Sequence, residues 1–305
     1  METATQVLMI RPVKFAMNPE TCHTNAFQKP THQTNDEVHQ KSSEQFDNFV
    51  KLLKDNGVDV TVIDDTVEPH TPDSIFPNNW ITFYHNGICL HSMENMNRRA
   101  ERKPHVLSAL REKFLISETV DLTASEAKHQ YLEGTGSVIL DRKNRIAYGC
   151  LSSRTHRAEF ENYCNLFNFK GICFNAVDSN NVPIYHTNVM LSVADRYVIV
   201  CLDAVRDENQ RRELLKSFHE SSKSVISISL DQMNNFAANV LQLQNGITGE
   251  KVLVMSTRAF NSLTGDQIAT ISKFNKIIHE NVDVIENNGG GGVRCMMAEI
   301  FLTLK

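Results

Sequence analysis

The sequence predicts an α/β protein in which five similar units form a ring around a common axis. Short β-rich segments open successive units and begin 57, 57, 53 and 57 residues apart. Each is followed by a β-hairpin and then by a helical stretch. The last unit ends at the C-terminus without its second strand and helix, and both pieces are found at the N-terminus. A ring closed by the two termini leaves few exposed strand edges.

The N-terminal segment supplies the pieces that the last unit lacks. Gln6–Ile10 is a short apolar run typical of a strand. Asp36–Asn56 places Phe46 and Phe49 on one face of a predicted helix. Between them, the polar loop from Asn18 to Asn35 is either a lid over a pocket or an ordinary long connection.

The remaining elements follow in a regular order, and we expect residues 1–305 to form one domain. Opening strands are predicted at Val58–Ile63, Leu115–Val120, Ile172–Val177, Val225–Leu230 and Val282–Ile285. Hairpins are predicted to pair Trp80–Tyr84 with Ile88–Met93, Ser137–Leu140 with Arg145–Tyr148, Val189–Val193 with Tyr197–Leu202, and Val240–Leu243 with Lys251–Met255. Helices are predicted at Arg99–Lys113, Arg157–Phe167, Glu208–Ser217 and Gly265–Ile278.

The C-terminal unit carries the most unusual local sequence. Four consecutive glycines, Gly289–Gly292, allow a tight bend and a close approach to a ligand. Cys295 follows, and Met296–Leu302 is typical of a strand, so this thiol stands where a loop enters a sheet. A buried structural cysteine after a turn fits these residues equally well. A phosphate-binding loop does not, because a strand follows the glycines and no Lys-Ser/Thr pair is present.

Composition narrows the function classes. The chain is 41% hydrophobic and 22% charged with a formal charge of −5, and its basic residues form no long run. These values argue against nucleic-acid binding and against attachment to anionic membranes. No window contains the roughly 18 apolar residues needed to cross a bilayer, and the N-terminus does not have the pattern of a signal peptide.

The cysteines and histidines indicate neither disulfides nor a metal site. The seven cysteines are an odd number, irregularly spaced and without a C-x-x-C pair, so we expect a reduced, cytoplasmic protein. The twelve histidines show no H-x-x-x-H or H-E-x-x-H spacing. We therefore expect no metal and no other cofactor.

The repeat predicts that five polar residues meet near the axis. Asn79, Glu133, His186, Asn239 and Cys295 stand at equivalent places in the five units, separated by 54, 53, 53 and 56 residues. A thiol, an imidazole and a carboxylate are the groups needed for nucleophilic catalysis. Any one of them alone would be an ordinary cap or turn residue, but three in register favour an active site.

Several short motifs give the chain a family resemblance. The sequence resembles the guanidine-modifying enzymes of the pentein superfamily, which include arginine deiminases, dimethylarginine hydrolases and amidinotransferases, and the resemblance covers nearly the whole chain. It is carried by Pro72–Phe76, Leu132–Gly134, Ser153–Thr155, His186–Asn188 and Gly292–Met296. Pro77–Trp80 resembles a bacterial group of citrulline-utilisation hydrolases most closely. The resemblance implies a five-bladed α/β propeller.

The resemblance also implies roles for individual residues. Cys295 would attack the central carbon of a guanidino or ureido group, His186 would move protons, and Glu133 would hold substrate nitrogens. Arg154 would pair with the α-carboxylate of the substrate, although a surface arginine at a helix start is the alternative. The remaining expected substrate-binding residues are Asp73, Phe76, Asn78, Asn79, Asn188 and Asn239.

Amides replace carboxylates at three positions of this expected site. The relatives usually carry acidic residues at the positions of Asn78, Asn79 and Asn188. Carboxylates stabilise a guanidinium cation, whereas an amide offers both a donor and an acceptor to a neutral ureido group. We therefore expect a hydrolase of a small amino-acid-like compound such as citrulline or an arginine derivative. Amidino transfer is the enzymatic alternative, a non-enzymatic binding role is a less favoured one, and a homo-oligomer is possible.

Overall fold

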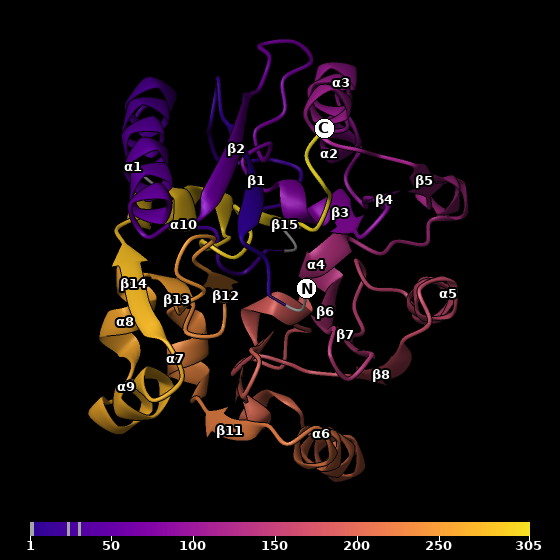
Figure 1. Ribbon diagram of the computed structural model, residues 1–305, viewed down its shortest axis with the longest axis vertical. Coiled ribbons are helices and arrows are strands. Elements are labelled where there is room, and N and C mark those ends of the chain that lie inside the picture. Colours follow the sequence, from indigo (N-terminus) through magenta and orange to yellow (C-terminus); the bar gives the residue numbers. More distant parts are fainter. Residues whose placement is uncertain (1–2, 23–24, 30–31) are drawn as a thin grey trace.

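The computed structural model describes residues 3–22, 25–29 and 32–305, and they form five sheets of three strands each. The sheets surround a central axis as blades, with helices around the rim (Figure 1). The predicted ring of five units is therefore confirmed. The assignment of residues 1–305 to a single domain stays a prediction.

Four blades are continuous in sequence. In each, an inner strand pairs antiparallel with a middle strand, which pairs in parallel with an outer strand. A helical connection links the middle strand to the outer one, as parallel pairing requires. The blades are β3 (Ile81–Tyr84), β4 (Gly87–Leu90) and β5 (Glu118–Asp121); β6 (Val138–Asp141), β7 (Ile146–Cys150) and β8 (Lys170–Phe174); β9 (Leu191–Val193), β10 (Tyr197–Val200) and β11 (Ser224–Ser227); and β12 (Leu241–Gln244), β13 (Lys251–Ser256) and β14 (Lys276–Glu280).

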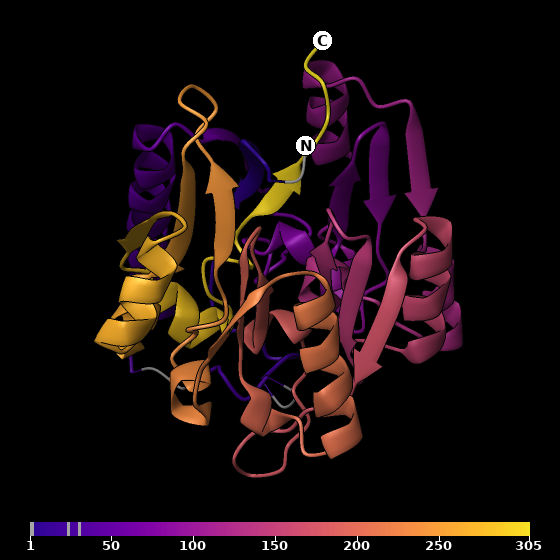
Figure 2. The same ribbon diagram turned by 60° about the horizontal axis from the view of Figure 1, so that its bottom comes forward.

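The fifth blade joins the two ends of the chain. β15 (Ala298–Ile300) from the C-terminus pairs antiparallel with β1 (Gln6–Arg11), which pairs in parallel with β2 (Asp59–Asp64). β1 and β15 lie side by side near the centre of the ring (Figure 1), and the second view shows both chain ends on the same side of the molecule (Figure 2). The closure predicted from the incomplete last unit is thus observed.

Helices follow the strands along the chain. They are α1 (Asn35–Asp55), α2 (Met96–Arg99), α3 (Pro104–Lys113), α4 (Gly134–Ser137), α5 (Arg157–Leu166), α6 (Glu208–Glu220), α7 (Leu230–Asn234), α8 (Thr257–Ser262), α9 (Gly265–Ser272) and α10 (Asp283–Gly289). Short 3₁₀ turns are η1 (Pro77–Asn79), η2 (Thr123–Lys128), η3 (Thr187–Val189) and η4 (Leu202–Ala204). In the described part of the chain, no helix is both long and apolar enough to span a bilayer.

Two predicted elements near the C-terminus are wrong. Val282–Ile285 is not a strand but the start of α10, and its buried residues Val282 and Ile285 have the three-residue spacing of a helix face. The predicted helix to Ile278 ends at Ser272, because the chain then pairs with β13 as the strand β14. The outer strand of this blade therefore begins six residues before the predicted position.

The helix α1 closes the ring and is well specified locally. Thr34 caps its N-terminus in a capping box with Glu37. Phe46 is fully buried against the closing blade.

We expect Phe46→Ala to lower the free energy of unfolding by about 3–5 kcal/mol, because it leaves a cavity between α1 and the sheet. Urea denaturation measures this loss. Leu215→Ala on α6, where the leucine is 37% exposed, is the control and should change little; equal losses would contradict the prediction.

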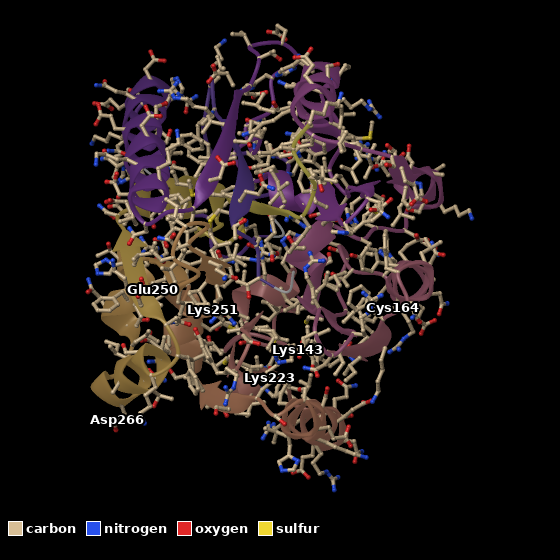
Figure 3. The ribbon with its side chains drawn as sticks, viewed as in Figure 1. Lys143, Cys164, Lys223, Glu250, Lys251 and Asp266 are labelled. Carbon is tan, nitrogen blue, oxygen red and sulfur yellow. The ribbon has the colours of Figure 1, made fainter. Side chains whose placement is uncertain are left out.

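Ion pairs tie neighbouring blades together around Asp195, in the β9–β10 turn. Lys251 of β13 and Lys143 of the β6–β7 turn pair with its carboxylate. Lys223 donates to the Asp195 carbonyl oxygen at 2.9 Å and pairs with Asp141 at 3.0 Å. Figure 3 shows the three lysines gathered on one side of the ring. The hydrogen bond from Lys251 and burial shift the pKa of Asp195 in opposite directions, and the pKa is lowered overall.

Candidate active site

The innermost strand of every blade is preceded by one of the five residues that the repeat singled out. Asn79 ends η1 before β3, Glu133 precedes α4 and β6, and His186 precedes η3 and β9. Asn239 and Cys295 stand just ahead of β12 and β15. α4 and β15 both lie at the centre of the ring (Figure 1).

A small pocket lies where these segments meet. It is lined by Asn25, Asp73, Phe76, Asn79, Arg98, Arg154, Tyr185, His186, Gly289–Gly291 and Cys295. Six of the expected site residues therefore share one pocket, and three more touch its walls. Asn78 is the exception, since its amide donates to Thr135 at 3.2 Å and does not line the pocket.

Cys295 is held by two amides. The thiol is 3% exposed, and its Sγ accepts hydrogen bonds from Asn188 Nδ2 at 3.2 Å and Asn239 Nδ2 at 3.3 Å. Asn239 is itself fixed, because its Oδ1 accepts from the backbone N–H of Arg294 at 3.2 Å. Burial raises the pKa of Cys295, and the two amide hydrogen bonds oppose that rise. Two donors aimed at the sulfur are suited to a thiolate that forms during reaction.

His186 and Glu133 form a buried pair. Nε2 of the imidazole lies 2.8 Å from Oε2 of Glu133, and both side chains are shielded from solvent. Burial lowers the pKa of His186 to about 4 despite the neighbouring carboxylate. Burial alone would raise the pKa of Glu133, but Arg154 and His186 outweigh it and bring the pKa to about 2. At neutral pH the pair is therefore a neutral imidazole beside an ionised carboxylate, poised to accept a proton.

Gly136 makes room for this pair. A Cβ at this position would lie 2.5 Å from Asn79 Nδ2 and 2.8 Å from the His186 ring. We expect Gly136→Ala to displace the imidazole and to lower kcat by about 100-fold, since small misplacements of reacting groups have effects of that size. Steady-state kinetics measures the loss. Gly265→Ala, where a Cβ meets nothing within 4 Å, is the control. An unchanged kcat in Gly136→Ala would show that the position of His186 does not limit the reaction.

Two arginines bring positive charge to the pocket. Arg154 is almost completely buried, stacks on the Tyr185 ring at 4.9 Å, and lies 3.6 Å from Glu133 and 3.4 Å from Glu94. Arg98 is equally buried and makes a bidentate pair with Glu101. Sequence reasoning placed Arg154 here but missed Arg98, because no motif or repeat position in the sequence singles it out.

Some polar atoms in and beside the pocket have no hydrogen-bond partner among the described residues. They include Asp73 Oδ1, Asn79 Nδ2 and Asn188 Oδ1. The orientation of the Asn79 amide follows from Arg98, whose Nη1 donates to Asn79 Oδ1 at 3.0 Å. Buried polar atoms are normally paired, so two acceptors and one donor without partners indicate a polar ligand. Burial raises the pKa of Asp73, while Arg98 opposes the rise.

The loop between β1 and α1, which we call the covering loop, contacts the pocket through Asn18 and Asn25. Asn18 donates to Asp73 at 2.7 Å, and Asn25 donates to the carbonyl oxygens of Gly289 and Gly290, each at 3.3 Å. The covered pocket has only about 10 Å³ of free volume, roughly one water molecule. Residues 23, 24, 30 and 31 of this loop lie outside the described residues.

The side chains of the pocket can carry out acid–base and thiol chemistry. Within residues 3–22, 25–29 and 32–305, no group of three or more His, Cys, Asp and Glu side chains could hold a metal ion. A five-bladed α/β propeller with a thiol, an imidazole and a carboxylate at its centre defines the class of guanidine-modifying pentein enzymes.

The comparison with protein families identifies the family within this class. The chain belongs to the N,N dimethylarginine dimethylhydrolase family, eukaryotic, whose model matches residues 11–302. It is thus a hydrolase that acts on non-peptide C–N bonds. A search of curated proteins found no match to the sequence.

Solved structures show the same fold at low sequence identity. The N-terminal domain of ArgZ, an arginine dihydrolase from the Ornithine-Ammonia Cycle in Cyanobacteria, is 14% identical with a TM-score of 0.76, and the match covers 97% of this chain and 99% of that one. Unliganded AgrE is 16% identical with a TM-score of 0.75, covering 97% of this chain and 39% of AgrE. A dimethylarginine dimethylaminohydrolase adduct is 15% identical with a TM-score of 0.66, covering 97% and 99%.

Proposed function

We propose that the protein hydrolyses a C–N bond of a ureido group in a small amino acid such as citrulline, with arginine derivatives as weaker substrates. The observation that carries this choice is the set of unpartnered atoms beside Cys295. A guanidinium offers only donors, so it would leave the Asn79 Nδ2 donor without an acceptor. A ureido group supplies a carbonyl oxygen for this donor and N–H groups for Asp73 Oδ1 and Asn188 Oδ1.

The charge of the pocket supports the same choice. Asp73 is the only carboxylate among the described residues that line it, and Arg98 and Arg154 line it as well. A cationic guanidinium would therefore meet a single lining carboxylate, whereas a neutral ureido group needs none. Arg154, already stacked on Tyr185, would hold the substrate carboxylate by a charge-assisted hydrogen bond.

In the proposed reaction, Cys295 Sγ bonds to the ureido carbon while its proton passes to His186. The imidazolium, stabilised by Glu133, then protonates the departing amine, and the C–N bond breaks to leave an S-carbamoyl enzyme. Water, deprotonated by His186, attacks the same carbon and releases the thiol. With citrulline the products are ornithine and carbamate, which decomposes to ammonia and carbon dioxide.

Steady-state assays with citrulline, arginine and methylarginines, following ornithine, citrulline and ammonia, test the substrate. We expect citrulline to have the highest kcat/KM. A clear advantage of arginine would overturn the ureido assignment and leave the C–N hydrolase in place.

Asn79→Asp should change this preference. The new carboxylate removes the amide donor and adds negative charge beside the reacting group. We expect the ratio of kcat/KM for citrulline to that for arginine to fall by about tenfold to a hundredfold, as for one hydrogen bond to a charged group. Asn78→Asp is the matched control, because Asn78 is adjacent in sequence but does not line the pocket. An equal shift in both variants would contradict the role of Asn79.

We propose two further properties of the protein, its compartment and its self-association. All seven cysteines are free thiols, which supports a reducing, cytoplasmic compartment. Self-association remains a prediction, and sedimentation velocity would test it.

A further inference from the structure

A second cavity lies directly behind the wall of the catalytic pocket. It has about 240 Å³ of free volume, and Tyr185 is the one lining residue that it shares with the catalytic pocket within the described chain. It is lined by Ala26, Phe27 and Lys29 of the covering loop, by residues of the turn at 178–184, and by side chains from α7, α8 and the residues that follow α7. The volume suits a molecule of the size of a small organic acid.

The walls of this cavity combine apolar surface with positive charge. Phe27, Tyr185 and Phe236 form an aromatic side, with Phe27 packed 5.2 Å from Phe236 and 6.1 Å from Tyr185. Lys29 and Arg258 supply two cations.

The two cations are not neutralised to the same extent. Arg258 pairs with the buried Glu286 at 3.2 Å, whereas Lys29 acts on the same carboxylate only at longer range and makes no ion pair within 4 Å in the described part of the chain. The acidic residue of the lining, Asp178, has one oxygen engaged by the backbone N–H groups of Asn180 and Val182. Aromatic walls beside two cations that share one buried carboxylate fit a ligand with an apolar body and one carboxylate.

The residues that form this cavity also contact the walls of the catalytic pocket. Phe27 and Lys29 follow Asn25 in the covering loop, and Asn25 holds the Gly289 and Gly290 carbonyl oxygens. The Tyr185 hydroxyl donates to the same Gly290 carbonyl at 2.7 Å.

Arg258 makes a second connection through α10. Its Nη2 donates to Asn287 at 2.8 Å, and the Lys29 backbone N–H donates to the Asn287 carbonyl oxygen at 2.7 Å. α10 then leads into Gly289–Gly291, which line the catalytic pocket. A ligand held between Lys29 and Arg258 would therefore favour the position of the loop that covers Cys295.

We propose that this cavity is an effector site for a small carboxylate with an apolar or aromatic body, and that its occupancy stabilises the covered state of the catalytic pocket. The carboxylate lies between Lys29 and Arg258, and the body packs against Phe27, Tyr185 and Phe236. The site is distinct from the one that binds the substrate, and its ligand undergoes no reaction.

Phenylacetate is the probe, and binding is measured by calorimetry on the full chain. We expect saturable one-to-one binding. Val182→Trp, which places an indole at the cavity wall, should weaken it at least about tenfold. Val225→Trp on β11 is the matched control, because Val225 is exposed to a similar extent (39% against 46%) but lies outside the cavity. Lys29→Gln should weaken binding, and Lys29→Arg should retain it. Benzylamine, which has the same ring but a cation, should not bind.

Coupling to the catalytic pocket has a readout that does not depend on turnover. Phenylacetate should slow the alkylation of Cys295 by iodoacetamide, followed by mass spectrometry, at least about fivefold. The half-buried Cys173 on β8 is the internal control, and its rate of alkylation should not change.

No binding of phenylacetate, or binding that Val182→Trp leaves intact, would overturn the site. Binding that leaves the Cys295 rate unchanged would overturn the coupling. None of these outcomes depends on whether citrulline is the substrate.

Discussion

Replacement of Cys295 by alanine is expected to abolish turnover of every substrate, with a loss in kcat of about 10⁴- to 10⁶-fold, as for other nucleophiles that act as part of a unit. The sulfur receives two amide hydrogen bonds and lies in the same pocket as His186. Without the sulfur, no other described side chain of the pocket is a comparable nucleophile, because the lining consists otherwise of amides, arginines, aromatic rings, glycines, one carboxylate and one imidazole. Product release by the purified variant measures the loss.

The control for this experiment is a second cysteine of the same protein. Cys150→Ala removes a fully buried thiol on β7 whose pKa burial raises to about 12, and which does not line the pocket. We expect it to retain kcat, with a modest loss of stability. Mass spectrometry of the wild type after a rapid quench should also show a substrate-derived adduct on the Cys295 peptide. Substantial turnover by Cys295→Ala would contradict the covalent mechanism.

Replacement of Glu133 by glutamine is expected to lower kcat by about 10²- to 10⁴-fold, the usual contribution of proton transfer, with a smaller change in KM. The amide can still accept a hydrogen bond from His186, so the ring keeps a partner. It cannot stabilise the imidazolium that forms when Cys295 gives up its proton, because the negative charge 2.8 Å away is gone. Glu126→Gln is a matched control, since Glu126 pairs with Arg102 outside the pocket.

A pH titration separates this electrostatic role from a merely structural one. The hydrogen bond and charge of Glu133 raise the pKa of His186 against the larger effect of burial, which brings it to about 4. In Glu133→Gln we expect this pKa to fall further, and NMR titration of the imidazole measures the shift. An unchanged or higher pKa of His186 in the variant would contradict the assignment, whatever the effect on kcat.

The same pair links folding to pH. The unfolded chain would protonate His186 near its ordinary pKa of 6.5 and Glu133 near 4.5, whereas the folded values are about 4 and about 2. The unfolded state therefore binds more protons as the pH falls. These two groups accordingly contribute stability above pH 6.5 that is lost progressively as the pH falls through 6.5 towards 4, and then towards 2.

Much of the architecture was predictable because it depends on local chemistry that repeats. Strands, hairpin turns and amphipathic helices recur at a nearly constant interval, and an incomplete last unit requires a partner at the N-terminus. The outer strand β14 was not predictable in this way. Ile277 and Ile278 fit a buried helix as well as a strand, and pairing with β13 decides between them.

The sequence by itself determined which residues come to the axis, because the repeat places Asn79, Glu133, His186, Asn239 and Cys295 at equivalent positions. Only the tertiary structure decided how those residues are used. Arg98 orients the Asn79 amide across the pocket, two amides point at the thiol, and the covering loop brings Asn25 to the glycines. These contacts join segments from different blades, and their geometry is set by packing between blades rather than by any local pattern. The cavity behind Tyr185 arises in the same way, from three segments that no sequence spacing relates.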